Sequence, residues 1–133
     1  WAPNTVTWTG NNRTHLVRVP GPGRFELRLP DGAANPYLMQ AVILAAGLDG
    51  VRTNADPGPR HDIDMYRDGH TVKGAPRLPL NLLDALRMYD QDETLKAIMG
   101  EAFSSAYVKL KTDEWNSYCS HFSEWERDNT LDI

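Results

Sequence analysis

The sequence changes its pattern at Asn35-Pro36, and this change limits the fold more than any other feature. Before it, short runs of β-branched residues alternate with glycine and proline; after it, apolar residues recur at spacings of three and four. The first pattern is typical of short strands joined by turns, and the second of amphipathic helices. Strands that come first and helices that follow predict an α+β fold.

The first part predicts three strands, at residues 6–9, 14–19 and 24–29. Pro20-Gly21-Pro22-Gly23 is rich in turn-forming residues and separates the second strand from the third. The expected sheet is therefore a small antiparallel β meander, which Pro30-Asp31-Gly32 ends.

A helix is expected to begin after Asn35, because asparagine is a favoured N-cap and Pro36 suits the first helical position. We expect it to run through Ala46 and to be closed by Gly47, a common C-terminal residue of helices. The helix is apolar on nearly all sides. This predicts that it is buried against the sheet.

A long segment from Arg52 to Pro79 is rich in proline, glycine, aspartate and arginine and has no periodicity. Segments of this length without structure are usually functional or belong to an interface. Within it, Asp68-Gly69 is expected to turn a small hairpin.

Helices are expected after this segment. The first contains the leucines at 80, 82, 83 and 86 and runs to Tyr89; Asp90 and Glu93 have the spacing of a capping box for the second, which Gly100 ends. Aromatic and apolar residues between 103 and 127 predict one last amphipathic helix, whose aromatic side chains serve packing.

Composition excludes several classes of function. The chain has 133 residues, the size of one domain, with 41% hydrophobic residues and a net charge of −4. It has no run of lysine and arginine, so we expect neither nucleic acid nor an anionic membrane as its partner. The apolar run Tyr37–Leu48 is too short to span a bilayer.

The single cysteine and the first residue of the chain lead to two further expectations. Cys119 is the only cysteine and has no evident base nearby, so we expect an inert thiol and a reducing, cytoplasmic location. The chain begins with Trp1 instead of methionine, from which we expect a fragment of a longer protein.

Charged residues alternate with apolar ones in the third expected strand. Arg24, Glu26 and Arg28 would project from one face, since neighbouring side chains of a strand point to opposite sides. A carboxylate between two guanidiniums could hold a divalent cation and an anion. On the pattern alone, the commoner interpretation is an exposed strand whose charges neutralise one another.

Arg13 and Arg18 are five positions apart and would face opposite sides of one regular strand. If both are functional, Arg13 must lie in the loop before the strand, or a β-bulge must intervene. The alternative is two unrelated surface arginines.

His61, Asp62 and Asp64 match no established metal-ligand spacing, and we expect them to belong to a solvated loop.

Four motifs, in order, resemble those of glutamine synthetases: NRTHLVRVP at 12–20, RFELRLPD at 24–31, ANPYL at 34–38 and AGLDG at 46–50. The closing WERDNTLDI at 125–133 resembles the end of the family's last helix. The resemblance is strongest to the branch called type III in α-proteobacteria. It implies that residues 1–133 are the C-terminal portion of the catalytic domain, which is incomplete and inactive alone.

The resemblance also implies partners and residue roles. The family's active sites lie between neighbouring subunits of a double-ring homo-oligomer, a dodecamer, and use ATP with Mg or Mn. Glu26 would bind a metal, and Arg28 would hold glutamate and the γ-phosphoryl group. Arg13 would stabilise charge during phosphoryl transfer, and Arg18 and Arg24 would bind the nucleotide.

The identity of the amine stays open at the level of the sequence. Family members usually carry a glutamate before an Ala-Pro pair, and here Trp1 precedes Ala2-Pro3. An indole at the ammonium site is compatible with a glutamine synthetase that uses ammonia, or with a γ-glutamylalkylamide ligase that uses methylamine or a polyamine. A non-catalytic assembly protein is the alternative of another class.

Regulation by modification is not expected. Tyr66 falls where some bacterial members are adenylylated, but its neighbours lack the Asn-Leu-Tyr-Asp-Leu pattern of such sites. We therefore expect an unmodified surface tyrosine.

Overall fold

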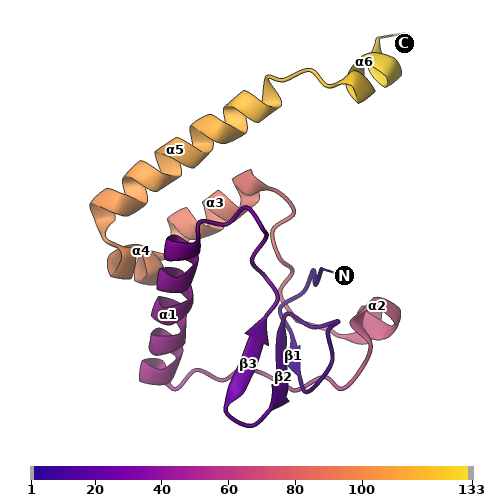
Figure 1. Cartoon of the computed structure of the whole chain (residues 1–133), viewed down its shortest axis with the longest axis vertical. Coiled ribbons are helices and arrows are strands. Elements are labelled where there is room, and N and C mark those ends of the chain that lie inside the picture. Colours follow the sequence, from indigo (N-terminus) through magenta and orange to yellow (C-terminus); the bar gives the residue numbers. More distant parts are fainter. Residues whose placement is uncertain (1, 132–133) are drawn as a thin grey trace. The chain divides into compact units, whose positions relative to one another are not determined.

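The computed structural model describes residues 2–131 and confirms the α+β fold (Figure 1). The chain divides into two compact units, residues 1–78 and 79–133. The first contains a three-stranded sheet and one long helix, and the second is helical. No helix among residues 2–131 has both the length and the apolar character that a membrane span requires.

The sheet consists of β1 (Trp8–Thr9), β2 (Val17–Gly21) and β3 (Arg24–Leu27), in that order. β2 and β3 pair antiparallel, as predicted, but β1 and β2 run parallel, so the sheet is not a meander throughout. Residues 10–16 return the chain to the starting end of β1, whereas a meander would reverse its direction in a tight turn.

The hairpin between β2 and β3 is tighter than predicted. β2 continues through Gly21, and only Pro22 and Gly23 form the turn; Gly23 has φ +75°, as the third position of a type II turn requires. Between the pairs Arg18–Glu26 and Gly21–Arg24, β2 has one residue more than β3. Pro20 lies in this bulge, where its missing N–H disturbs no regular ladder.

Helix α1 (Pro36–Thr53) begins as the sequence predicts. The side chain of Asn35 accepts hydrogen bonds from the backbone N–H groups of Tyr37 and Leu38. The predicted end at Gly47 is wrong, because α1 continues to Thr53 and is capped by Asn54 in the left-handed conformation, with φ 50°. A glycine inside a helix costs only about 1 kcal/mol, which is too little to end it.

The predicted burial of α1 against the sheet needs correction. Ala45 is the helix's buried residue, and α1 packs on no other helix or strand of residues 2–131. An apolar composition indicates which surface favours burial, but it does not determine whether a partner covers that surface.

The segment after α1 is more ordered than predicted. The expected hairpin at Asp68-Gly69 is wrong: α2 (Met65–Asp68) leads directly into a 3₁₀ helix, η1 (Gly69–Thr71). Asp64 causes this, because its carboxylate accepts hydrogen bonds from the N–H groups of Tyr66 and Arg67 and starts a helical turn.

The second unit contains α3 (Leu82–Gln91), α4 (Glu93–Met99), α5 (Glu101–Cys119) and α6 (Glu124–Thr130). Gly100 ends α4, as predicted, with φ 92°. Asp92, and not Asp90, caps α4. The single helix predicted for 103–127 is two, because Ser123 and Glu126 form a capping box that begins α6.

Helices α3, α4 and α5 pack on one another around Leu86, which is buried. The Tyr89 and Ser104 hydroxyls share a hydrogen bond of 2.7 Å, and the Tyr89 ring meets Tyr107 edge-on, with centroids 6.1 Å apart. Tyr107 of α5 therefore serves packing, as the sequence predicts, whereas Tyr118 near the end of the helix is exposed.

Leu86→Ala should lower the free energy of unfolding of this unit by about 2–5 kcal/mol, because it leaves a cavity among three helices. Leu110→Ala on exposed α5 surface is the matched control and should change it by less than about 0.5 kcal/mol. Urea unfolding of the chain followed by far-UV circular dichroism measures both. Equal effects would show that Leu86 is not the centre of this core.

Candidate functional site

The charged face of the β2–β3 hairpin is formed by Arg18, Glu26 and Arg28. Arg18 lies opposite Glu26 in the antiparallel register, and its Nη1 donates to Glu26 Oε2 at 2.7 Å. Arg28 Nη1 donates to Glu26 Oε1 at 2.8 Å. Each carboxylate oxygen thus faces one guanidinium, so three charges that the sequence spreads over eleven residues meet at one point.

The burial of this face reverses the usual pattern of a strand. The side chains of Arg18 and Arg28 are only 13% and 18% exposed, whereas Phe25, on the other face of β3, is 63% exposed. Removing charge from water costs free energy that ion pairing offsets only in part. Guanidiniums are therefore held here at a cost, which is typical of anion-binding sites and unusual for solvated strands.

The two arginines control the protonation of Glu26. Hydrogen bonds from Arg28 and then Arg18 lower the pKa of the Glu26 carboxyl below its ordinary value of 4.5. Because the folded pKa is the lower one, the ion pairs stabilise the fold above pH 4.5, and this stabilisation is lost as the pH falls through the folded pKa. Glu26 is thus anionic at neutral pH.

The remaining site residues lie apart from this cluster or outside the described part. Arg13 is exposed in the turn before β2, so it and Arg18 do not share one strand. Arg24 is exposed opposite Gly21 and makes no ion pair within residues 2–131. Trp1, predicted at the amine site, lies outside the described residues.

The segment from Gly58 to Met65 runs along β1 and is bonded to it. Trp8 Nε1 donates to the Gly58 carbonyl at 2.9 Å, and the His61 N–H donates to the Trp8 carbonyl at 3.2 Å. The hydroxyl of Thr9 donates to Asp62 Oδ1 at 2.8 Å. This part of the long segment is therefore fixed to the sheet.

A second set of bonds holds this segment to the residues around Arg13. Asn12 Nδ2 and His15 Nε2 both lie within 3.0 Å of the Ile63 carbonyl oxygen, at 2.9 and 3.0 Å. The Met65 N–H donates to Thr14 Oγ1 at 3.0 Å. Sequence analysis missed Asn12, Thr14 and His15, because no local pattern indicates bonds between residues about fifty positions apart.

The prediction that His61, Asp62 and Asp64 form a plain solvated loop needs refinement. Asp64 caps α2, and hydrogen bonds from Thr9 and then Arg60 lower the pKa of the Asp62 carboxyl. Both acidic side chains thus hold local structure. The described residues contain no group of three or more histidine, cysteine or acidic side chains arranged for a metal.

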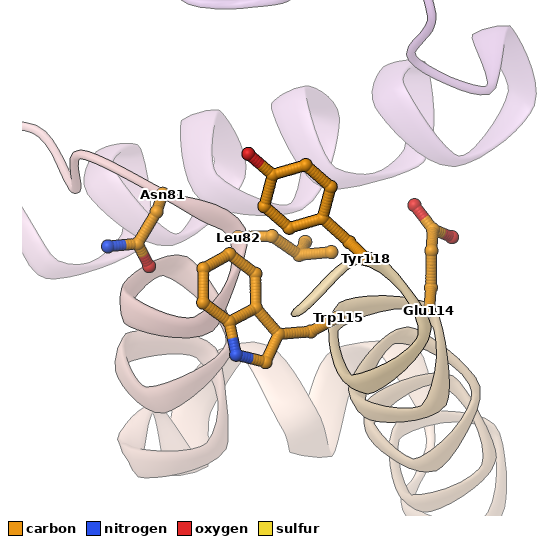
Figure 2. A pocket seen from close by; sticks show the side chains of 5 residues that line it. All are labelled: Asn81, Leu82, Glu114, Trp115 and Tyr118. Atoms are coloured by element: carbon orange, nitrogen blue, oxygen red, sulfur yellow. The ribbon is translucent and has the colours of Figure 1, made fainter. Parts of the chain in front are cut away.

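The second unit has a cavity of about 410 Å³ between the start of α3 and the end of α5. Figure 2 shows its lining residues: Asn81, Leu82, Glu114, Trp115 and Tyr118. The Trp115 and Tyr118 rings are 5.7 Å apart at an angle of 40°. Glu114 is paired with Lys111 in the same helix, so its charge is already compensated.

Comparison with known proteins assigns the chain to a family. The model of the glutamine synthetase catalytic domain matches residues 1–130. The chain belongs to the glutamine synthetase family. The resemblance that the four motifs carry is thereby confirmed.

The relatives of this chain carry two different enzyme names. The glutamine synthetases of Rhizobium leguminosarum bv. phaseoli and Rhizobium meliloti (strain 1021) are 76% and 71% identical over the whole chain. The glutamate–methylamine ligase of Methyloversatilis universalis is 38% identical, again over the whole chain. The chain spans about 31% of the length of the first two and 30% of the third.

Solved structures of this family share the fold closely. A ligand-free structure of GmaS has a TM-score of 0.92 at 61% identity over 99% of this chain, and a GmaS complex with ADP has 0.93 at 62% over 100%. The chain spans 31% and 30% of those proteins.

Arg28→Ala should raise the pKa of Glu26 toward its ordinary value, because it removes the hydrogen bond that lowers that pKa most. Arg24→Ala, on β3 with Glu26, is the matched control and should leave the pKa of Glu26 unchanged. A pH titration of the Glu26 carboxyl ¹³C shift measures both variants. An unchanged midpoint in Arg28→Ala would contradict the geometry described for the charged face.

Proposed function

We propose that this chain forms part of the active site of an ATP-dependent ligase, which joins an amine to the γ-carboxyl of glutamate. The observation that carries the proposal is the half-buried Arg18–Glu26–Arg28 cluster in a chain of the glutamine synthetase family. The protein would be the C-terminal portion of the catalytic domain, with the other parts of the site supplied by the rest of the longer chain and by a neighbouring subunit.

Each charged side chain has a role in this proposal. Arg18 and Arg24 bind the phosphates of ATP, and Arg28 binds glutamate and the phosphoryl group as it moves to the γ-carboxyl. Arg13 stabilises the negative charge that develops during transfer, because a guanidinium already in place needs no reorganisation. The product of this step is γ-glutamyl phosphate, which the amine attacks with release of phosphate. The ADP complex of the structurally similar GmaS supports the use of a nucleotide.

Glu26 fits a role as one ligand of Mg²⁺ or Mn²⁺. Hard divalent cations prefer carboxylate oxygens, and Glu26 is anionic at neutral pH. Arg18 and Arg28 each donate to one oxygen of this carboxylate. A phosphate that accepted hydrogen bonds from these guanidiniums instead would leave the carboxylate available to a metal. A metal bound there would withdraw charge from the transferring phosphoryl group. We propose that the other ligands come from outside this chain.

The proposed amine is ammonia, which makes glutamine the product. The names of the two rhizobial relatives, at 76% and 71% identity, support this choice. A γ-glutamylalkylamide ligase is the second candidate. It is favoured by Trp1 at the expected position of a carboxylate and by the name of the methylamine ligase at 38% identity.

A non-catalytic assembly protein is the candidate of another class. The retention of Glu26 argues against it, because a protein kept only for assembly does not need a carboxylate between two half-buried arginines. We further propose a cytoplasmic homo-oligomer, a double-ring dodecamer as in the resembled family.

The full-length protein should form a γ-glutamyl amide and ADP from glutamate, ATP and an amine. Ammonia, methylamine and putrescine, compared by kcat/KM in parallel assays, identify the acceptor. Preference for ammonia supports glutamine synthesis, and preference for an alkylamine supports the second candidate. No product with any amine would overturn the ligase proposal in favour of the assembly protein.

Glu26→Gln in the full-length protein should abolish turnover, because it removes an anionic metal ligand but keeps the size of the side chain. Glu101→Gln, at an exposed position of α5, is the matched control with the same charge change. Size-exclusion chromatography should show both variants assembled as wild type. Retained activity with an unchanged magnesium dependence in Glu26→Gln would exclude the metal role.

A further inference from the structure

We propose that Asn12, Thr14 and His15 are positioning residues that fix the backbone on either side of Arg13. They form what we call the loop lock, a set of hydrogen bonds to residues 63–65. This inference rests on the proposed function, because it assumes that Arg13 acts in phosphoryl transfer. It adds three residues that have no contact with substrate in the proposal.

The contacts of Asn12 determine how its amide is oriented. Its Oδ1 accepts from the backbone N–H and from the hydroxyl of Thr14, both at 2.9 Å, and its Nδ2 donates to the Ile63 carbonyl at 2.9 Å. A flipped amide would place an oxygen against that carbonyl oxygen and a nitrogen against an N–H. One side chain therefore ties both flanks of the Arg13 turn to the segment that follows α1.

His15 strengthens the same attachment from inside the unit. It has no exposed surface, and its Nε2 must be the donor to Ile63, because a carbonyl oxygen only accepts. Its Nδ1 lies 3.0 Å from the hydroxyl oxygen of Thr7, which can accept or donate. Both ring nitrogens are satisfied, so the imidazole is held in one orientation.

Thr14 completes the lock on the other side of Arg13. Its hydroxyl donates to Asn12 Oδ1 and accepts from the Met65 N–H, so both of its hydrogen-bonding functions are used. Because Thr14 is buried, water cannot take over the two hydrogen bonds of its hydroxyl unless the surrounding structure rearranges.

Arg13 differs from its neighbours in the way that a catalytic side chain requires. Asn12, Thr14 and His15 all bond to residues 63–65, whereas the Arg13 guanidinium makes no hydrogen bond or ion pair within residues 2–131. The backbone is thus held rigidly, and the cation remains available for an anion. Preorganised charge of this kind loses its effect when it is misplaced by a small distance.

The first test is Asn12→Asp in the full-length protein. The carboxylate keeps the acceptor for Thr14 and the size of the side chain, but it repels the Ile63 carbonyl. We expect kcat to fall by about 100-fold, the cost of a misplacement of roughly 1 Å, with little change in KM for ATP or glutamate. Asn116→Asp, exposed on α5, makes the same charge change and should retain wild-type kcat.

A double-mutant cycle separates positioning from general damage. In the Arg13→Ala background, Asn12→Asp should lower kcat by less than about twofold, because its effect passes through a side chain that is no longer there. The same 100-fold loss in both backgrounds would overturn the proposal and make Asn12 a merely structural residue.

Thr14 provides a rescue test. Thr14→Ser keeps the hydroxyl and should retain nearly wild-type kcat, whereas Thr14→Val keeps the shape, leaves the Met65 N–H without an acceptor and should lower kcat. Equal activity in the two variants would contradict the lock.

Hydrogen exchange gives a measurement that needs no activity. Amides of residues 63–67 should exchange faster in Asn12→Asp and in Thr14→Val than in wild type, and at the wild-type rate in Asn116→Asp. Unchanged exchange in the first two would overturn the lock. A wild-type protein that makes no amide would overturn the proposed function, and the exchange rates would still decide whether the lock exists.

Discussion

The ion pairs of Glu26 with Arg18 and Arg28 are the interaction on which the geometry of the candidate site depends. They require the antiparallel register that places Arg18 opposite Glu26, so any slip of β2 against β3 would separate the charges. The bulge at Pro20 absorbs one extra residue beyond this pair and leaves the register at Arg18 intact. Without the carboxylate, the two half-buried guanidiniums would repel each other, and this repulsion would destabilise the arrangement of β2 and β3 at the site.

The interior of the first unit is unusually polar, and this gives the site a defined frame. Thr7, Thr9, Thr14 and His15 are buried there, with Leu16 and Ala45 as the buried apolar residues. Polar interiors are costly unless their groups are paired, and hydrogen bonds join these side chains to one another or to residues 62–65. Such bonds are directional, so they select one arrangement of the turn around Arg13 more strictly than apolar contacts would.

Local signals in the sequence predicted local structure well. The Asn35 cap and the end at Gly100 each depend on a few neighbouring residues. The parallel pairing of β1 and the extent of α1 through Gly47 depend on tertiary contacts or on small energy differences, and no local pattern contains them. The lock on the Arg13 turn joins residues 48 to 51 positions apart, which is why Asn12, Thr14 and His15 could not be found from spacing.

Under the proposed function, the charged face determines the reaction class and leaves the amine to other residues. Guanidiniums and a carboxylate recognise phosphate, carboxylate and metal, which every ligase of this type must handle before the amine arrives. A neutral amine gains nothing from Arg18 or Arg28, and its cation would be repelled by them. Relatives named glutamine synthetase and glutamate–methylamine ligase both match the whole chain, at 76% and 38% identity, which fits a phosphoryl-transfer face shared by both under this proposal. Selection of the amine then falls to other positions, among which the sequence suggests Trp1.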